Sequence, residues 1–183
     1  MKFRLSLIIL TFLTLWVILT NQLSSQNCWV YNKSNTDNNL SSVVFSDSLI
    51  GIAAGDDVIL RTTDGGKNWK IQFSSSLNIH YYDVSLHRGN KGLAVGGVLN
   101  HPTGNHGVIY RTTNGGIIWG ELITISNSLH AVSFADSSTG VTVGGFGTIL
   151  WTTNGGNTWT QQVSGGSANL NAVSCINVNF AFA

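Results

Sequence analysis

One phrase of ten residues occurs three times in this chain of 183 residues. It is spelled RTTDGGKNWK at 61–70, RTTNGGIIWG at 111–120 and WTTNGGNTWT at 151–160. The three tryptophans lie 50 and 40 residues apart. Repetition at this period indicates one supersecondary unit stacked against the next, because a single unit of this size cannot bury its own apolar face.

A second phrase precedes each copy of the first. It is VVFSDSLIGIAAG at 43–55, VSLHRGNKGLAVG at 84–96 and VSFADSSTGVTVG at 132–144, and it begins again as VSCINVNFAFA at 173–183. The third unit divides into AVSFAD, GVTVGG, TILWTT and TWTQQV, four short apolar or alternating runs separated by turn residues. The sequence therefore predicts an all-β fold, a β-propeller of four-stranded blades.

The repeated phrase falls between the third and fourth predicted strands. Asp64, Asn114 and Asn154 are expected to accept hydrogen bonds from backbone N–H groups ahead of them, and the paired glycines that follow supply positive φ. The tryptophan after each turn is expected to cover it. These positions are predicted to be structural, although carboxylate and amide groups also occur in catalytic sites.

The N-terminus has the pattern of a secretory signal peptide. Lys2 and Arg4 precede a largely apolar run that extends to Leu19, and a polar stretch follows. We expect residues 1–26 to be a signal peptide, with cleavage near Ser25 or Gln26; an uncleaved membrane anchor is the alternative, and the run is short for a span. The mature chain is expected to be exported, to a periplasm, the cell surface or the extracellular medium, with no membrane span after cleavage.

Charge excludes some classes of partner. Without Lys2 and Arg4 the chain keeps seven basic and eight acidic residues. A surface so close to neutral does not attract nucleic acid, so none is expected as a partner. No cofactor is expected either.

The phrase resembles the Asp-box of BNR-type repeats, Ser/Thr-x-Asp-x-Gly-x-x-Trp, with Asn replacing Asp in two copies. The sequence around the phrase is most similar to that of propellers in the photosystem II assembly and stability factor family. The resemblance implies a seven-bladed, non-enzymatic scaffold that binds a protein, with a role in photosynthesis and a membrane complex subunit as partner. The matching positions are Thr62, Asp64, Gly66 and Trp69; Thr112, Asn114, Gly116 and Trp119; and Thr152, Asn154, Gly156 and Trp159.

The repeat sets the expected domain organisation. Blades are predicted at 40–74, 81–125 and 129–164, with the start of a fourth at 170–183. Trp29 stands before the first unit at the distance that a fourth strand keeps, so residues 27–34 are expected to form the closing strand of the last blade. We therefore expect residues 27–183 to be an incomplete propeller within a longer reading frame.

Binding residues are expected at the end of the blades opposite the Asp-box turns. Ser41, Tyr82, His130 and Asn171 share one register at the entrance of each first strand. There they would surround the mouth of the central channel, where varied polar side chains form a recognition surface or merely a solvated rim. The preceding positions, Leu40 and Tyr81 among them, are expected to pack between blades.

An insertion in the second unit adds a loop at the same end. The added segment, VLNHPTGNH, carries Asn100, His101, Asn105 and His106. Two histidines could bind a metal, yet no carboxylate or cysteine accompanies them. A binding loop without metal is the expectation, and no metal site is predicted.

Arginine offers a third candidate surface. Arg61 and Arg111 occupy equivalent positions in two repeats, and a similar patch of arginines in the resembled family is implicated in partner binding. Trp151 interrupts the series. Sialidase-like enzymes use three arginines to hold a carboxylate, and Arg88 would be the third here, but the repeat equivalence of the first two favours a structural role.

Two other functions remain open. A glycoside hydrolase of sialidase or xyloglucanase type would need paired acids facing the channel, where the sequence offers only Asp83. A secreted surface or adhesion module would carry a further domain. No catalytic residue is assigned. Cys175 takes the place of an apolar residue and is expected to be a buried thiol, far from Cys28.

Overall fold

The computed structural model describes residues 31–87, 90–100 and 105–183. They form a structure that is almost entirely β, and no helix among them is long and apolar enough to cross a membrane. The predicted signal peptide at 1–26 and Cys28 lie outside the described residues.

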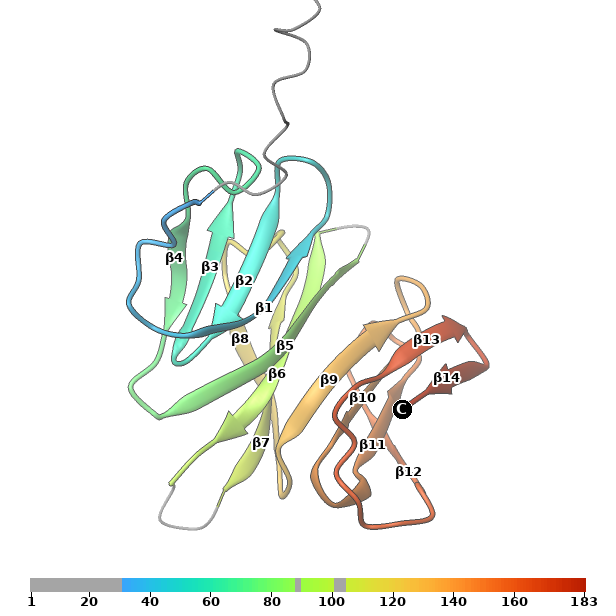
Figure 1. The fold of residues 1–183 in the computed structure, drawn as a ribbon. Coiled ribbons are helices and arrows are strands. Elements are labelled where there is room, and N and C mark those ends of the chain that lie inside the picture. Colours follow the sequence, from blue (N-terminus) through green and yellow to red (C-terminus); the bar gives the residue numbers. More distant parts are fainter. Residues whose placement is uncertain (1–30, 88–89, 101–104) are drawn as a thin grey trace, which may run out of the picture. The chain divides into compact units, whose positions relative to one another are not determined.

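Three four-stranded antiparallel sheets follow one another along the chain (Figure 1). Blade 1 consists of β1 (Leu40–Phe45), β2 (Gly51–Gly55), β3 (Val58–Thr62) and β4 (Lys70–Ser74). Blade 2 consists of β5 (Ile79–His87), β6 (Lys91–Val98), β7 (His106–Thr112) and β8 (Gly120–Ile125). Blade 3 consists of β9 (Leu129–Phe134), β10 (Gly140–Gly144), β11 (Ile149–Thr152) and β12 (Thr160–Gln162), with the short 3₁₀ helix η1 (Gly145–Gly147) between β10 and β11.

A two-stranded sheet ends the described chain. It pairs β13 (Ser174–Asn177) with β14 (Phe180–Phe182), the first two strands of a further unit. In every sheet the strands pair in sequence order, so each blade is a simple meander. The expected all-β propeller of four-stranded blades is confirmed.

The hydrophobic core lies between the blades rather than within any one of them. Ile52 and Ile59 of blade 1 pack with Tyr81 and Trp119 of blade 2 in one cluster. A second cluster joins blades 2 and 3, and a third joins blade 3 to β13 and β14. Each blade therefore depends on its neighbour for burial.

This arrangement explains the composition of the strands. The second strands lie inside their sheets and are buried at every position except Lys91, and GIAAG and GVTVG accordingly show no polar alternation. The fourth strands lie at sheet edges, and that of blade 3, TQQ, is exposed throughout. Polar composition at the edge is a common defence against pairing with other chains.

The face of blade 1 that carries Val43 is more exposed than the corresponding faces of blades 2 and 3. Val43 is 59% exposed, whereas Val84 and Val132, at the same position in blades 2 and 3, are 4% and 6% exposed. Phe45 is also 45% exposed. In blades 2 and 3 the preceding blade covers this face.

The two ends of the described chain differ in structure. Residues 31–34, the described part of the predicted closing strand, lie in irregular backbone. A fourth strand needs the third strand of its own blade, and the described residues contain no blade that lacks only its fourth strand. Cys175 is partly buried, packs against the third cluster, and donates its thiol to the Ser133 carbonyl at 3.4 Å.

Candidate functional site

Each first strand carries a β-bulge at the same position. The register between first and second strands shifts between Leu40 and Ser42 in blade 1 and between Tyr81 and Asp83 in blade 2. Blade 3 shows the same shift opposite Val143 and Gly144. A bulge leaves one residue without a partner and redirects its side chain. The residues so placed are Ser41, Tyr82 and His130.

Glycine is required opposite each bulge. A Cβ atom added to Gly55, Gly96 or Gly144 would lie about 2 Å from a backbone carbonyl oxygen of the first strand or the residue before it, a contact that no side chain can make. The last glycine of the GIAAG, GLAVG and GVTVG segments therefore permits the close backbone approach at the bulge. The repeat thus encodes the geometry of the candidate site as well as the fold.

Two of the bulged residues, Tyr82 and His130, belong to a row of side chains that crosses the blades. We call Asp56, His80, Tyr82 and His130 the rim row. The ring of His80 lies 4.9 Å from that of Tyr82, and the ring of Tyr82 lies 5.3 Å from that of His130 in an edge-to-face contact. His130 Nδ1 is 3.2 Å from the carbonyl oxygen of Leu170, where the next unit begins.

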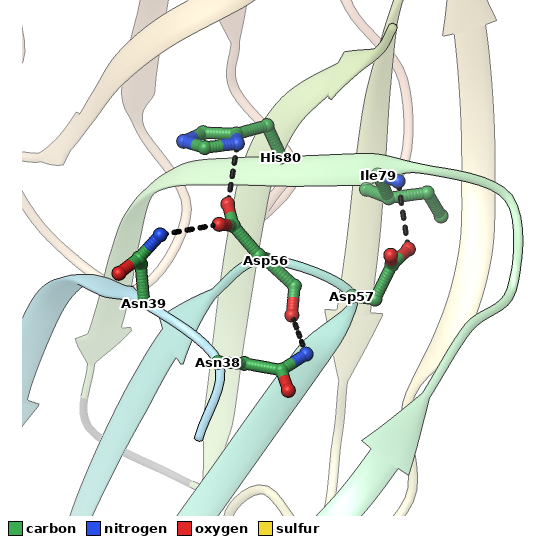
Figure 2. Close-up of polar contacts among 6 residues, drawn as sticks. All are labelled: Asn38, Asn39, Asp56, Asp57, Ile79 and His80. Carbon is green, nitrogen blue, oxygen red and sulfur yellow. Dashed lines mark hydrogen bonds and ion pairs between the residues drawn. The ribbon is translucent and has the colours of Figure 1, made fainter. Parts of the chain in front are cut away.

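An acidic group closes the row on the side of blade 1. The Asp56 carboxylate pairs with Nδ1 of His80 and accepts a hydrogen bond from Asn39 Nδ2 at 3.0 Å, so the three side chains point toward one another in Figure 2. The next carboxylate, Asp57, accepts the backbone N–H of Ile79 at 2.8 Å. These bonds join the β2–β3 turn of blade 1 to the first strand of blade 2.

The members of the rim row are half-buried, with His80 and Asp56 each exposing 31% of their side chains. Burial, and secondarily the Asp56 carboxylate, raises the pKa of Tyr82, so its phenol stays protonated at neutral pH. The row thus offers aromatic faces, a phenol donor and imidazole nitrogens side by side. That is the chemistry of a surface that recognises a polar, partly apolar partner such as a peptide.

The other predicted binding positions lie apart from these contacts. Ser41 and Asn171 are exposed at the two ends of the series. In the inserted loop, Asn105 Oδ1 accepts the backbone N–H of Asn100 at 2.9 Å, and His106 begins β7. His101 lies outside the described residues.

Both arginines are engaged between blades. Arg61 Nε donates to the Gly115 carbonyl at 2.7 Å, and Arg111 Nη1 donates to Asn157 Oδ1 at 2.5 Å. Each guanidinium therefore reaches the Asp-box turn of the following blade. Trp151 replaces arginine in blade 3, where the side chain packs against the third core cluster.

The Asp-box turns share one hydrogen-bond pattern. The threonine hydroxyl donates to the side-chain oxygen two residues on and accepts the N–H of the second glycine, as Thr62 does with Asp64 and Gly66 at 2.8 and 3.0 Å. The acid or amide then accepts backbone N–H groups ahead of it. All six paired glycines have positive φ, between 69° and 84°. The polar side chains of each Asp-box are therefore hydrogen-bonded within their own turn, as predicted for a structural role.

Asp83 is the one acid that the sequence predicted to face the channel, and its carboxylate accepts three hydrogen bonds within the fold. Its Oδ1 accepts Ser42 Oγ at 2.8 Å and the N–H of Val84 at 2.9 Å, while Oδ2 accepts the N–H of Val132 at 2.9 Å. The carboxylate thus binds blades 1, 2 and 3 together. Within the described ranges no three His, Cys, Asp or Glu side chains are grouped so as to hold a metal ion.

The sequence register placed Tyr82 and His130 at one end of the blades, where their rings are in contact, but it did not indicate the two residues beside them. Asp56 and His80 do not belong to the aligned register, and the repeat has no equivalent ion pair in blade 3. The available signal was the glycine that ends each second-strand segment, because a glycine inside a strand pattern often marks a bulge.

No protein-family model matches the sequence, and no curated protein matches it. Solved structures do share its fold. The structure described as YCF48 bound to D1 peptide superposes with a TM-score of 0.62 at 22% identity, over 75% of this chain and 43% of that chain. YCF48 from Cyanidioschyzon merolae gives a TM-score of 0.58 at 24% identity, over 71% of this chain and 41% of that one.

An enzyme shares the fold as well. The crystal structure of an ancestral GH74 enzyme superposes with a TM-score of 0.58 at 17% identity, over 79% of this chain and 21% of the enzyme chain. The present chain spans less than half the length of the YCF48 chains and a smaller part of the enzyme. At these identities the likenesses establish the β-propeller fold.

Proposed function

We propose that this chain is part of a non-enzymatic propeller scaffold that binds a protein partner through the rim row. The observation that carries the proposal is the pair of bulges that brings Tyr82 and His130, from different blades, into ring contact at one end of the blades. Bulges of this kind commonly redirect side chains at functional sites. Half-buried aromatic side chains with polar tips are the residues that dominate protein recognition.

The bonding of the carboxylates supports a binding function over catalysis. Glycoside hydrolysis needs one acid to protonate the leaving group and a second to act as nucleophile or base. Asp83 is held by three hydrogen bonds, Asp57 by a backbone N–H, and Asp56 by His80 and Asn39. Structural bonds of this kind hold the three carboxylates in fixed positions within the fold.

For the partner, we propose an exposed peptide of a membrane complex subunit. The YCF48 structure with a D1 peptide is of a propeller similar in fold to this one. The proposal also takes residues 1–26 as an export signal, which would deliver the mature chain to the periplasm, the cell surface or the extracellular medium. Arg61 and Arg111 contribute less than the rim row in this proposal, because both guanidinium groups already bind neighbouring turns.

The test uses a fluorescein-labelled D1 peptide and the full chain. Fluorescence polarisation is expected to show saturable binding, and Tyr82→Ala or His130→Ala is expected to weaken it about tenfold, as loss of a central aromatic contact usually does. Lys67→Ala, an exposed change in the Asp-box turn of blade 1, serves as control. Absence of binding, or equal loss in all three variants, would contradict the proposal.

A glycoside hydrolase is the second candidate, and the superposition on the GH74 enzyme favours it. The test is release of reducing sugar from xyloglucan by the full chain, with Asp83→Asn as the diagnostic variant. Turnover that disappears in this variant, while the variant keeps the unfolding temperature of the unmodified chain, would replace the scaffold proposal. Absence of turnover together with peptide binding would leave the scaffold as the better account.

A further inference from the structure

A pocket of about 770 Å³ lies at the Asp-box end of the blades, opposite the rim row. Its walls are formed by the ends of β1, β5 and β9, by residues of the turns after β1 and β9, and by Asn90 and Gly115 of blade 2, so blades 1, 2 and 3 all contribute. Its size is in the range of sites for small ligands or for one or two side chains of a peptide. The predicted binding residues do not line it.

Aromatic rings form much of the wall. Phe134 stacks on His87 with ring centres 4.3 Å apart and planes inclined by 21°, and the exposed ring of Phe45 faces the pocket from blade 1. Both ring nitrogens of His87 are buried without a hydrogen-bond partner among the described residues. Burial, reinforced by Lys91 and Arg111, lowers the pKa of His87, so the imidazole is neutral and acts as an aromatic surface.

Two carboxylates stand at the rim of the pocket. Oδ1 of Asp47 accepts the N–H groups of Leu49 and Ile50, both at 2.7 Å. Oδ1 of Asp136 accepts those of Ser138 and Thr139, at 2.7 and 2.6 Å.

These backbone bonds lower the pKa of both carboxyl groups, so Asp47 and Asp136 are anionic at neutral pH. Each turn fixes one oxygen of its carboxylate in place. The backbone bonds use only Oδ1; Oδ2 of Asp47 is 3.5 Å from the Ser46 hydroxyl, the one hydrogen bond that either Oδ2 receives from the described residues. Lys91 and Arg111 lie close enough to influence His87, yet neither lines the pocket, and Arg111 is bonded to Asn157.

We propose that this pocket binds the cationic side chain of an arginine or lysine within an extended peptide. Aromatic faces attract a cation through the ring quadrupole, and fixed carboxylates supply the complementary charge. Neutral His87 permits this, whereas an imidazolium would repel the ligand. The site is separate from the rim row and gives the scaffold a second contact at the other end of the blades.

The probe is a fluorescein-labelled pentapeptide, Gly-Leu-Arg-Leu-Gly, with the same peptide carrying glutamate instead of arginine as negative control. Saturable binding of the arginine peptide is expected at neutral pH, with little binding of the glutamate peptide. The double variant Asp47→Asn with Asp136→Asn keeps the turn-forming oxygens, because asparagine accepts the same backbone bonds. It is expected to weaken binding by at least about tenfold, and each single variant less.

Asp37→Asn is the matched control, since it removes one exposed carboxylate outside the pocket. Phe134→Leu tests the aromatic wall independently of charge and is also expected to weaken binding. Unfolding temperatures of all variants verify that the fold is retained. Equal affinity for the glutamate peptide, an unchanged affinity in the double variant, or binding of a neutral oligosaccharide such as cellotetraose in place of the arginine peptide would each overturn the proposal. D1-peptide binding at the rim row is measured on the same variants, so the two proposals fail separately.

Discussion

At the scale of single residues, Asp64 is the one acid among three equivalent Asp-box positions, since the other two are Asn114 and Asn154. Hydrogen bonds from the Asn68 side chain and backbone, followed by one from Thr62, lower the pKa of Asp64 to about 2. Its ionised form is therefore favoured by folding. The stabilisation is present above the unfolded pKa and is lost as pH falls through the folded value.

This asymmetry predicts an acid-sensitive blade 1. Unfolding temperatures measured by circular dichroism should fall between about pH 4 and about pH 2, and Asp64→Asn should reduce that fall by removing the titrating group. Asn114→Asp should increase the fall by less than Asp64 contributes, because Ile118 stands where blade 1 has Asn68 and donates only its backbone N–H. Identical pH profiles for the three proteins would show that the bond to Asn68 contributes nothing to stability.

At the scale of strands and turns, the Asp-box glycines join blades as well as closing hairpins. Gly116 lies against Ile52 of blade 1, and Gly156 lies against Leu93 of blade 2. Gly66, the equivalent in blade 1, has only side chains of its own blade nearby. The same turn is thus used in two environments, one with a blade packed on it and one without.

The pair Gly66→Ala and Gly116→Ala separates backbone strain from packing. The two glycines have φ of 84° and 82°, so alanine costs roughly 1–2 kcal/mol of strain at either. At Gly116 the new methyl would meet Ile52 Cδ1 at 2.2 Å, whereas at Gly66 the nearest atom is 3.6 Å away. Overpacking should add about 1–3 kcal/mol at Gly116 alone. Urea denaturation measures both, and equal losses would contradict the packing between blades.

Strand positions and turns followed from the sequence because the upstream phrase occurs four times and the Asp-box phrase three times. The bulges did not follow from the sequence. They arise where a glycine lets two strand backbones approach closely, and the pattern of apolar residues does not indicate the distance between backbones. The register of the repeat placed Tyr82 and His130 at equivalent positions, which the bulges confirm. Asp56 and His80 were not indicated by the register, because their ion pair joins two blades and depends on how those blades pack. The pocket at the Asp-box end was missed for the same reason.

At the scale of the whole molecule, stability depends on contacts between blades. Within the described residues, one face of blade 1 has no preceding blade packed against it, whereas the same face of blades 2 and 3 has one. Leu40 is 40% exposed, whereas Tyr81 and Leu129 at the equivalent positions are fully buried. The valine series shows the same contrast. The same residue type at the same repeat position therefore contributes differently to the free energy of unfolding in different blades.

Valine-to-alanine changes along this series test that conclusion. Val84→Ala and Val132→Ala should each lower the free energy of unfolding by about 2 kcal/mol, because buried methyl groups and their contacts are lost. Val43→Ala should cost less than about 0.5 kcal/mol, since an exposed side chain leaves no cavity. Chemical denaturation of the full chain gives all three values. A cost at Val43 as large as at Val84 would mean that another surface covers blade 1 in solution.

The bonds of Asp83 have a mechanical consequence. Its carboxylate takes one donor from blade 1, one from its own strand and one from blade 3. Separating the blades at Asp83 would remove the donors that Ser42 and Val132 supply to a half-buried carboxylate, which costs more than sliding apolar side chains past one another. Asp83 therefore resists separation of the blades at this point more strongly than apolar packing alone would.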